Sequence, residues 1–119
     1  MSAFGASEFP VSDGLNAVEC GKKMVEFMGS NLIDGIDVDF EDNQAFKLNV
    51  AEQWVNVFMR QVRKTYPFHI ISHAPQAPYF DANYTKSGAY LTINKVTGKF
   101  IDFYNVQFYN QGNTTYTTY

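Results

Sequence analysis

The sequence is poor in cysteine and in positive charge. Its single cysteine, Cys20, can form no disulfide within the chain and has no Cys or His nearby with which to bind zinc. We expect Cys20 to be a small buried apolar side chain. The 9 basic residues are outnumbered by 12 acidic ones, so no basic stripe is available to neutralise nucleic-acid phosphates. No apolar run reaches the ~20 residues of a membrane span, so neither nucleic acid nor a membrane is an expected partner.

Leader segments, repeats and linkers are also lacking. Met1 leads straight into Ser-Ala-Phe-Gly, without the basic and apolar regions of a signal peptide, and this abrupt start leads us to expect a piece of a larger protein. With no internal repeat and no linker, residues 1–119 are expected to form a single partial domain. Two N-glycosylation tripeptides, which begin at Asn83 and Asn113, favour an extracellular (secreted) protein.

An alternating acidic stretch is the most informative feature present. Residues 36–41 alternate three apolar residues with three acidic ones, namely Ile36, Val38 and Phe40 with Asp37, Asp39 and Glu41. This alternation is the period-2 pattern of a β-strand. Neighbouring carboxylates on one strand face start only ~7 Å apart. Such like charges repel, so we expect a proton to be shared among them and their pKa values to separate.

Two other interpretations of this stretch are weaker. A solvated strand face is unfavourable because the like charges have nothing basic beside them. In a calcium loop starting at Asp37, the sixth position would be Asp42 instead of Gly and the twelfth Leu48 instead of Glu. Val38 and Phe40 would also interrupt the polar loop. We therefore expect acid/base chemistry and no metal site.

The acidic motif matches a known family signature. Residues 34–41 read D-G-I-D-V-D-F-E and fit the pattern D-x-x-D-x-D-x-E at all four acidic positions. In this motif the sequence resembles the family-18 glycoside hydrolases, the chitinase superfamily. Four fixed acids within eight residues make the resemblance specific.

Three further segments resemble the same family. Residues 2–5, S-A-F-G, are similar to its S-x-G-G third strand, with Phe4 where the first glycine is usual. Residues 74–78, A-P-Q-A-P, resemble a run that follows the fifth strand of plant-type (class III) chitinases, and residues 107–110, Q-F-Y-N, resemble the sixth-strand motif of that branch. The resemblance implies an α/β fold that covers strands three to six of a TIM (β/α)8 barrel, its central portion.

Local patterns predict the other elements. We expect a helix of about 15 residues opened by residues 12–14, with Asp13 as its cap. Its apolar side is expected to contain Leu15, Val18, Val25 and Met28. A helix over 50–65, a strand over 68–74, a weakly helical connection over 79–99 and a strand over 101–110 follow. The alternation of strands and helices predicts a parallel sheet with helices packed outside it.

Two groups of basic or histidine side chains are expected to be structural. Arg60, Arg63 and Lys64 lie near the end of the second helix, where they suit the helix dipole, and we interpret them as a solvated helix end instead of a binding patch. His69 and His73 fall on one face of the expected strand. No third ligand joins them, so packing or hydrogen bonding is favoured over metal binding.

The resemblance implies hydrolysis of β-1,4-linked N-acetylglucosamine, as in chitin, by a retaining mechanism in which the substrate's own acetamido oxygen attacks the anomeric carbon. Glu41 is implied as general acid and base, and Asp39 as the residue that orients the acetamido group. Asp37 would share a proton with Asp39, and Tyr109 would donate its hydroxyl to the acetamido oxygen. Gln107 and Asn110 would line the site. No cofactor is implied.

Three functions stay open. They are a chitinase, an endo-β-N-acetylglucosaminidase that acts on N-glycans, and a non-catalytic chitin-binding lectin or inhibitor on the same fold. Lectin-like relatives usually lose the last acid of the motif, so the presence of Glu41 favours an enzyme. An isolated stretch of four barrel strands leaves open sheet edges, so we expect the chain alone to be inactive and to associate through them.

Overall fold

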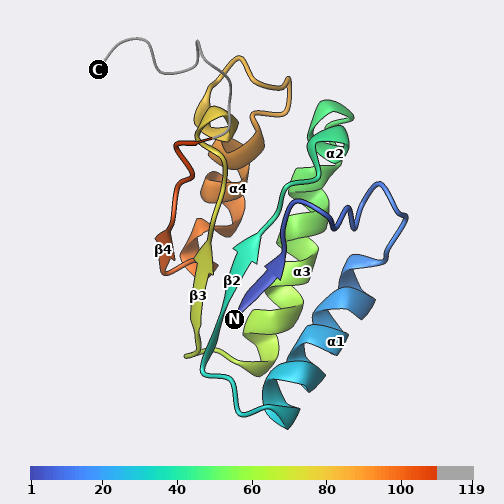
Figure 1. Cartoon of the computed structure of the whole chain (residues 1–119), viewed down its shortest axis with the longest axis vertical. Coiled ribbons are helices and arrows are strands. Elements are labelled where there is room, and N and C mark those ends of the chain that lie inside the picture. The colour runs from blue at the N-terminus through green and yellow to red at the C-terminus, as the bar shows by residue number, and fades with distance from the viewer. Residues whose placement is uncertain (110–119) are drawn as a thin grey trace.

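The computed structural model describes residues 1–109, which form a four-stranded parallel sheet with helices in its crossovers (Figure 1). The strands are ordered β1 (Ser2–Phe4), β2 (Gly35–Asp39), β3 (Ile70–His73) and β4 (Phe103–Tyr104). The main helices are α1 (Ala17–Ser30), α3 (Ala51–Thr65) and α4 (Ala89–Thr97). Shorter elements are α2 (Asn43–Lys47), η1 (Ala77–Phe80) and η2 (Gly98–Phe100). All three strand pairings are parallel, which confirms the predicted α/β class.

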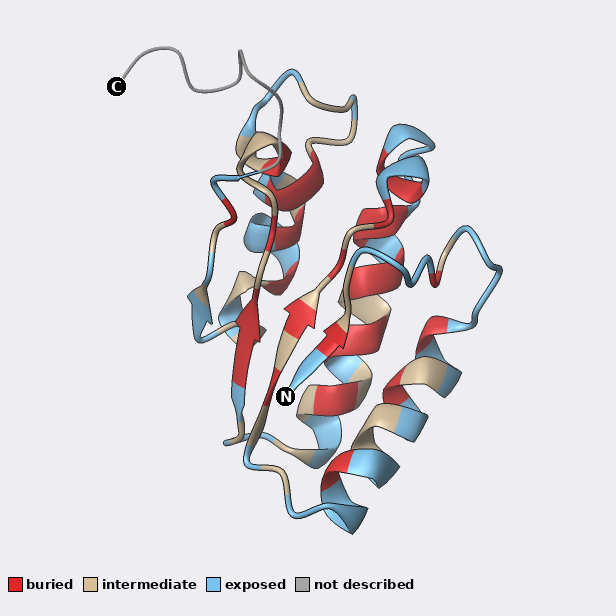
Figure 2. Cartoon of the chain, in the orientation of Figure 1, coloured by how far each residue is buried: buried red, intermediate tan, exposed pale blue. Residues whose placement is uncertain are grey.

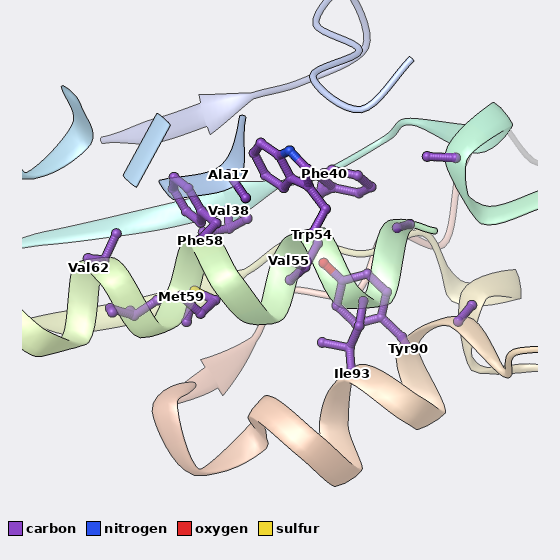
Figure 3. Close-up of a cluster of buried hydrophobic side chains, with 14 of the residues drawn as sticks. Ala17, Val38, Phe40, Trp54, Val55, Phe58, Met59, Val62, Tyr90 and Ile93 are labelled. Carbon is purple, nitrogen blue, oxygen red and sulfur yellow. The ribbon is translucent and has the colours of Figure 1, made fainter. Parts of the chain in front are cut away.

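The hydrophobic core lies between the sheet and α3, which packs against α1 on one side and α4 on the other. The buried face of α3 contains Trp54, Val55, Phe58, Met59 and Val62, as the sequence predicts. Figure 2 shows the buried residues following the strands and α3, and Figure 3 shows the side chains of α3 meeting Val38 and Phe40. The predicted bounds of this helix, 50–65, differ from the observed ones by one residue.

The prediction for α1 was wrong at its start. Asn16 caps the helix, because its side-chain oxygen accepts hydrogen bonds from the backbone N–H groups of Val18 (2.9 Å) and Glu19 (3.1 Å). Residues 10–14 form turns instead, so Asp13 lies outside the helix. Leu15 precedes the helix and Val18 lies in its first turn, and both are exposed, so the predicted apolar side was wrong at these two positions.

The buried face of α1 contains Ala17, Gly21 and Met28. Gly21 allows a close approach of the two helices, since a Cβ there would lie 2.6 Å from the Cβ of Gln61 on α3. Cys20 is only partly buried, which corrects the prediction of a fully buried thiol.

The second half of the chain also differs from its predicted elements. The connection over 79–99 contains the regular helix α4, whose Ala89, Tyr90, Ile93 and Thr97 are buried. Its own residues are weak helix formers, so packing decides its conformation. Within residues 101–109 the predicted strand pairs regularly at only two positions. Pro75 has no N–H to donate, and beyond it only Gln76 and Gln107 form an isolated bridge.

His73 has the packing role that the sequence predicts. It is fully buried, with Nδ1 2.9 Å from the Tyr90 hydroxyl and Nε2 3.3 Å from the Met59 sulfur. Burial lowers the pKa of His73 to about 3, so the ring is neutral. His69 precedes β3 and its ring lies 4.2 Å from that of Tyr66, so the predicted shared strand face was wrong.

Two further observations complete the fold. Arg63 is not solvated as predicted, because its side chain is only 12% exposed and forms an ion pair of 2.9 Å with Asp102.

No helix within residues 1–109 is both long and apolar enough to traverse a lipid bilayer.

Candidate active site

The acidic strand has the two faces that its alternation predicts. Ile36, Val38 and Phe40 are at most 3% exposed and face the helices. The intervening Asp37, Asp39 and Glu41 are partly exposed. The carboxylates therefore lie on the sheet face opposite the core, with Glu41 just beyond the C-terminal end of β2.

Asp37 is held by hydroxyl groups from both neighbouring strands. Ser2 and Ser72 lie directly opposite it in the parallel register. The Ser2 hydroxyl donates to one Asp37 oxygen at 2.9 Å, and the Ser72 hydroxyl donates to the other at 2.6 Å. These two hydrogen bonds fix the orientation of the Asp37 carboxyl behind Asp39.

Asp39 is hydrogen-bonded to Glu41, and the pKa of its carboxyl is raised. Burial, followed by the charge of Glu41, a hydrogen bond to Glu41 and the charge of Asp37, raises the pKa of Asp39 to about 6. The sequence predicts perturbed pKa values on this strand, and the raised pKa of Asp39 agrees with that expectation. It predicts Asp37 as the partner in proton sharing, whereas in the structure the hydrogen bond of Asp39 runs to Glu41.

Gln107 connects the two carboxylates to the neighbouring strand. Its side-chain amide nitrogen lies 2.8 Å from Asp39 Oδ1, 3.1 Å from Glu41 Oε1 and 2.7 Å from the Ala74 carbonyl oxygen. The side chain is buried, so these contacts fix the orientation of both acids. The structure thus brings together Asp37, Asp39, Glu41 and Gln107, four of the six residues that the sequence analysis places in the site.

Gln76 is a site residue that sequence reasoning missed. Its side-chain amide donates to Glu41 Oε2 at 2.9 Å, so each oxygen of Glu41 accepts from a glutamine. Backbone bonds from Gln107 N–H to Pro75 O (2.9 Å) and from Ala77 N–H to Gln107 O (3.0 Å) hold the two glutamines side by side. A signal was present in the sequence, because Gln76 lies in the A-P-Q-A-P segment just after β3.

Asp42 anchors the chain immediately after Glu41. It is fully buried and accepts from the backbone N–H groups of Val11 (3.0 Å), Ser12 (2.8 Å) and Ala45 (3.1 Å) and from the Ser12 hydroxyl (2.6 Å). Four donors satisfy a buried carboxylate without a basic partner. The long β1–α1 connection is thereby fastened beside the site, which the sequence pattern does not reveal.

Phe4 leaves space beside Asp39. The two residues pair in register, and regular alternation would direct the Phe4 side chain onto the acidic face. Phe4 instead takes a left-handed backbone with φ of +74°. Its ring packs 5.7 Å from that of Trp54 and 5.4 Å from that of Phe58, on the helix side. Gly5, with φ of +93°, then passes Asp39 with no side chain of its own.

The remaining predicted residues are not joined to this cluster. Tyr109 follows Gln107 by two residues and its side chain is 60% exposed, and within residues 1–109 the structure shows no hydrogen bond from it to the carboxylates. Asn110 lies outside the described residues. Asp34 precedes β2 and is exposed at the other end of the strand.

Metal ligands do not gather at the site. In the part of the chain that the structure describes, no group of three or more His, Cys, Asp or Glu side chains is arranged to hold a metal ion. The geometry instead offers two hydrogen-bonded carboxyl groups, those of Asp39 and Glu41, which two glutamine amides orient. Such a pair can deliver and recover a proton at the end of the strand.

Comparison with known proteins gives a likeness to a solved structure. No protein-family profile and no curated protein sequence matches the chain. Among solved structures, it is similar to the crystal structure of a GH18 chitinase from Pseudoalteromonas aurantia, with 30% sequence identity and a TM-score of 0.82. The match covers 97% of this chain and 43% of that chitinase, so the chain spans less than half of that protein. The predicted fold, parallel β/α units that form part of a TIM barrel, is confirmed by this match.

Proposed function

We propose that this chain supplies the catalytic centre of a family-18 chitinase that hydrolyses β-1,4-linked N-acetylglucosamine. The observation that carries the proposal is the Asp39–Glu41 pair, in which an aspartic acid with a raised pKa is bonded to a glutamate at the end of a barrel strand. The likeness to a GH18 chitinase supports it. Because the chain spans 43% of that chitinase, we assign the activity to a longer protein that contains this chain.

The proposed mechanism begins with Asp39. Asp39 is hydrogen-bonded to Glu41 in the resting site, and on substrate binding it orients the acetamido group so that the acetamido oxygen attacks the anomeric carbon. The resulting positive charge is stabilised by the nearby acidic side chains of the strand. Tyr109 is proposed to reach the acetamido oxygen from the substrate side, consistent with its exposed position.

Glu41 is proposed to transfer the protons. It protonates the leaving glycosidic oxygen and then, as a carboxylate, activates the water that completes hydrolysis. Its two oxygens accept from Gln76 and Gln107, which hold the carboxylate at the strand end. Asn110 remains a proposed substrate contact.

Finer assignments also remain proposals. The A-P-Q-A-P and Q-F-Y-N segments are the basis for the plant-type (class III) branch, while the similar structure supports the family and not that branch. An extracellular, secreted location rests on the N-glycosylation tripeptides, of which Asn83 is exposed and Asn113 lies outside the described residues.

The substitution Glu41→Gln in the longer protein tests the proposal. An amide keeps the shape of the side chain and cannot donate a proton to the leaving group, so turnover of chitooligosaccharides should be abolished while calorimetry still detects their binding. Asp34→Asn, which alters an exposed acid of the same motif, is the matched control and should retain turnover. Normal hydrolysis by Glu41→Gln would overturn the proposal, and binding without hydrolysis by the parent protein would identify the lectin alternative.

A further inference from the structure

A hollow of about 630 Å³ lies at the end of the sheet opposite the carboxylates. Its walls come from the last turns of α3, the loop that leads into β3, and residues 99–102 before β4. We call it the basic hollow, after the cations Arg60, Lys64 and Lys99 on its walls. Its volume falls within the range of sites that bind small molecules, about 300–1,000 Å³.

The floor of the basic hollow is fixed by Arg63. Its guanidinium donates to the carbonyl oxygen of Phe100 at 2.7 and 3.2 Å, to that of Pro67 at 3.2 Å and to that of His69 at 2.5 Å. It also pairs with Asp102 at 2.9 Å, and the same Asp102 oxygen accepts from the Ile71 N–H at 2.7 Å. These bonds use the donors of Arg63, so the floor is rigid and close to neutral.

Within residues 1–109 the three wall cations form no ion pair, and the ion pair that the structure shows there is Arg63–Asp102. The whole chain carries a net charge of -3, so a local excess of three positive charges stands out against it. A positively charged concave surface attracts anions.

Aromatic rings accompany these cations. Lys99 Nζ lies 5.1 Å from the centre of the Phe100 ring, and Arg60 Cζ lies 5.6 Å from it, so one ring holds two cations at the wall. Phe68 also lines the hollow and is 95% exposed. An exposed phenyl ring beside cations can stack on an apolar ring whose substituent is negatively charged.

A solvated helix end does not account for this arrangement. Cations near a helix C-terminus are favoured by its dipole, which explains Arg60 and Lys64. Lys99 belongs to η2, about 35 residues further along the chain than Lys64, and reaches the same hollow from the other side. The convergence of two separate segments on one hollow is a property of the fold and not of a single helix.

We propose that the basic hollow binds a small anion that carries an aromatic ring, such as an aryl phosphate or aryl carboxylate. The anionic group would contact Lys64, Lys99 and Arg60, and the ring would stack on Phe68. This site is separate from the acidic strand and does not depend on the proposed hydrolase activity.

Titration calorimetry of the full chain with 1-naphthyl phosphate tests the proposal. We expect binding that weakens as salt is raised, as for an ionic contact near the surface. Inorganic phosphate should bind about 10-fold more weakly, because it lacks the ring. The double variant Arg60→Gln/Lys99→Gln should lose about 10-fold or more in affinity, and Phe68→Ala should reduce the preference for the aryl compound.

The matched control is Lys22→Gln/Lys23→Gln, which removes the same charge from exposed positions on α1 and should leave binding unchanged. Thermal unfolding followed by circular dichroism checks that each variant folds. The proposal is overturned if 1-naphthyl phosphate shows no binding at millimolar concentration, if the control weakens binding as much as the wall variant, or if the folded wall variant binds as well as the parent. Displacement of the bound compound by a chitooligosaccharide would place it on the acidic strand and would equally overturn the proposal.

Discussion

Phe4 lies directly opposite Asp39 in the pairing of β1 with β2, yet its ring packs on the other side of the sheet. The left-handed φ of +74° produces this exchange of faces. A left-handed backbone costs a residue with a side chain about 1–2 kcal/mol. The contacts of the ring with Trp54 and Phe58 offset that strain, and the acidic face is left open beside Asp39.

This relationship predicts an unusual order of stability at position 4. Phe4→Ala should lower the free energy of unfolding by about 3 kcal/mol, because it removes a partly buried ring and keeps the strain. Phe4→Gly removes the same ring and relieves the strain, so it should be about 1 kcal/mol more stable than Phe4→Ala. Urea unfolding of both variants measures the difference. If the alanine variant is the more stable, position 4 is not strained.

The raised pKa of Asp39 predicts that stability depends on pH. Its folded-state pKa of about 6 exceeds the ordinary value of 3.8, so the folded chain binds this proton more tightly than the unfolded chain. The stabilisation is therefore fully present below pH 3.8 and is lost as pH rises through about 6. Asp39→Asn removes this titration. The free energy of unfolding of the variant minus that of the parent should therefore increase as pH rises from about 4 to about 7.

Comparing the two proteins at each pH isolates Asp39. Buried His73 acts in the opposite direction, because its pKa is lowered from 6.5 to about 3 and its stabilisation is lost as pH falls below 6.5. That contribution is the same in both proteins and cancels in the difference. Asp34→Asn should give a flat difference over the same range. A flat difference for Asp39→Asn as well would show that its carboxyl is not perturbed.

Substrate assistance predicts which sugars are cleaved. In the longer protein, chitooligosaccharides should be hydrolysed with the β-anomeric configuration retained, and oligosaccharides without a 2-acetamido group should be inert. Asp39→Ala should be nearly as damaging as Glu41→Gln, because the acetamido group loses its orienting partner. Nuclear magnetic resonance of the first products reports the anomer. Rapid cleavage of cellooligosaccharides would count decisively against the mechanism.

The open sheet edges predict association of the 119-residue chain by itself. Within residues 1–109, β1 pairs only with β2 and β4 pairs only with β3, so each leaves one edge without a neighbour. Apolar side chains near the β4 edge are exposed, including Phe103 at 50%. Unpaired edges of this kind favour contacts between chains. Light scattering should therefore give a mass above 13.5 kDa, without chitinase activity, and an active monomer would contradict the prediction.

Local sequence determined the elements whose signals are periodic. The alternation over 36–41 set which side chains of β2 face the core, because successive strand residues must point to opposite faces. The apolar spacing on α3 likewise set its buried face and almost its bounds. The raised pKa of Asp39 follows from burial together with the neighbouring acids that the alternation places beside it.

Tertiary structure decided everything that depends on pairing between distant segments. Gln76 and Gln107 reach Glu41 across 35 and 66 residues of sequence, because parallel strands bring their C-terminal ends to one edge of the sheet. α4 is a helix because its apolar side packs on α3, and the short pairing at β4 reflects the position of Pro75 in the neighbouring segment. The Arg63 side chain is buried because it binds backbone carbonyl oxygens and Asp102 from other segments. No local sequence pattern predicts that these groups lie together.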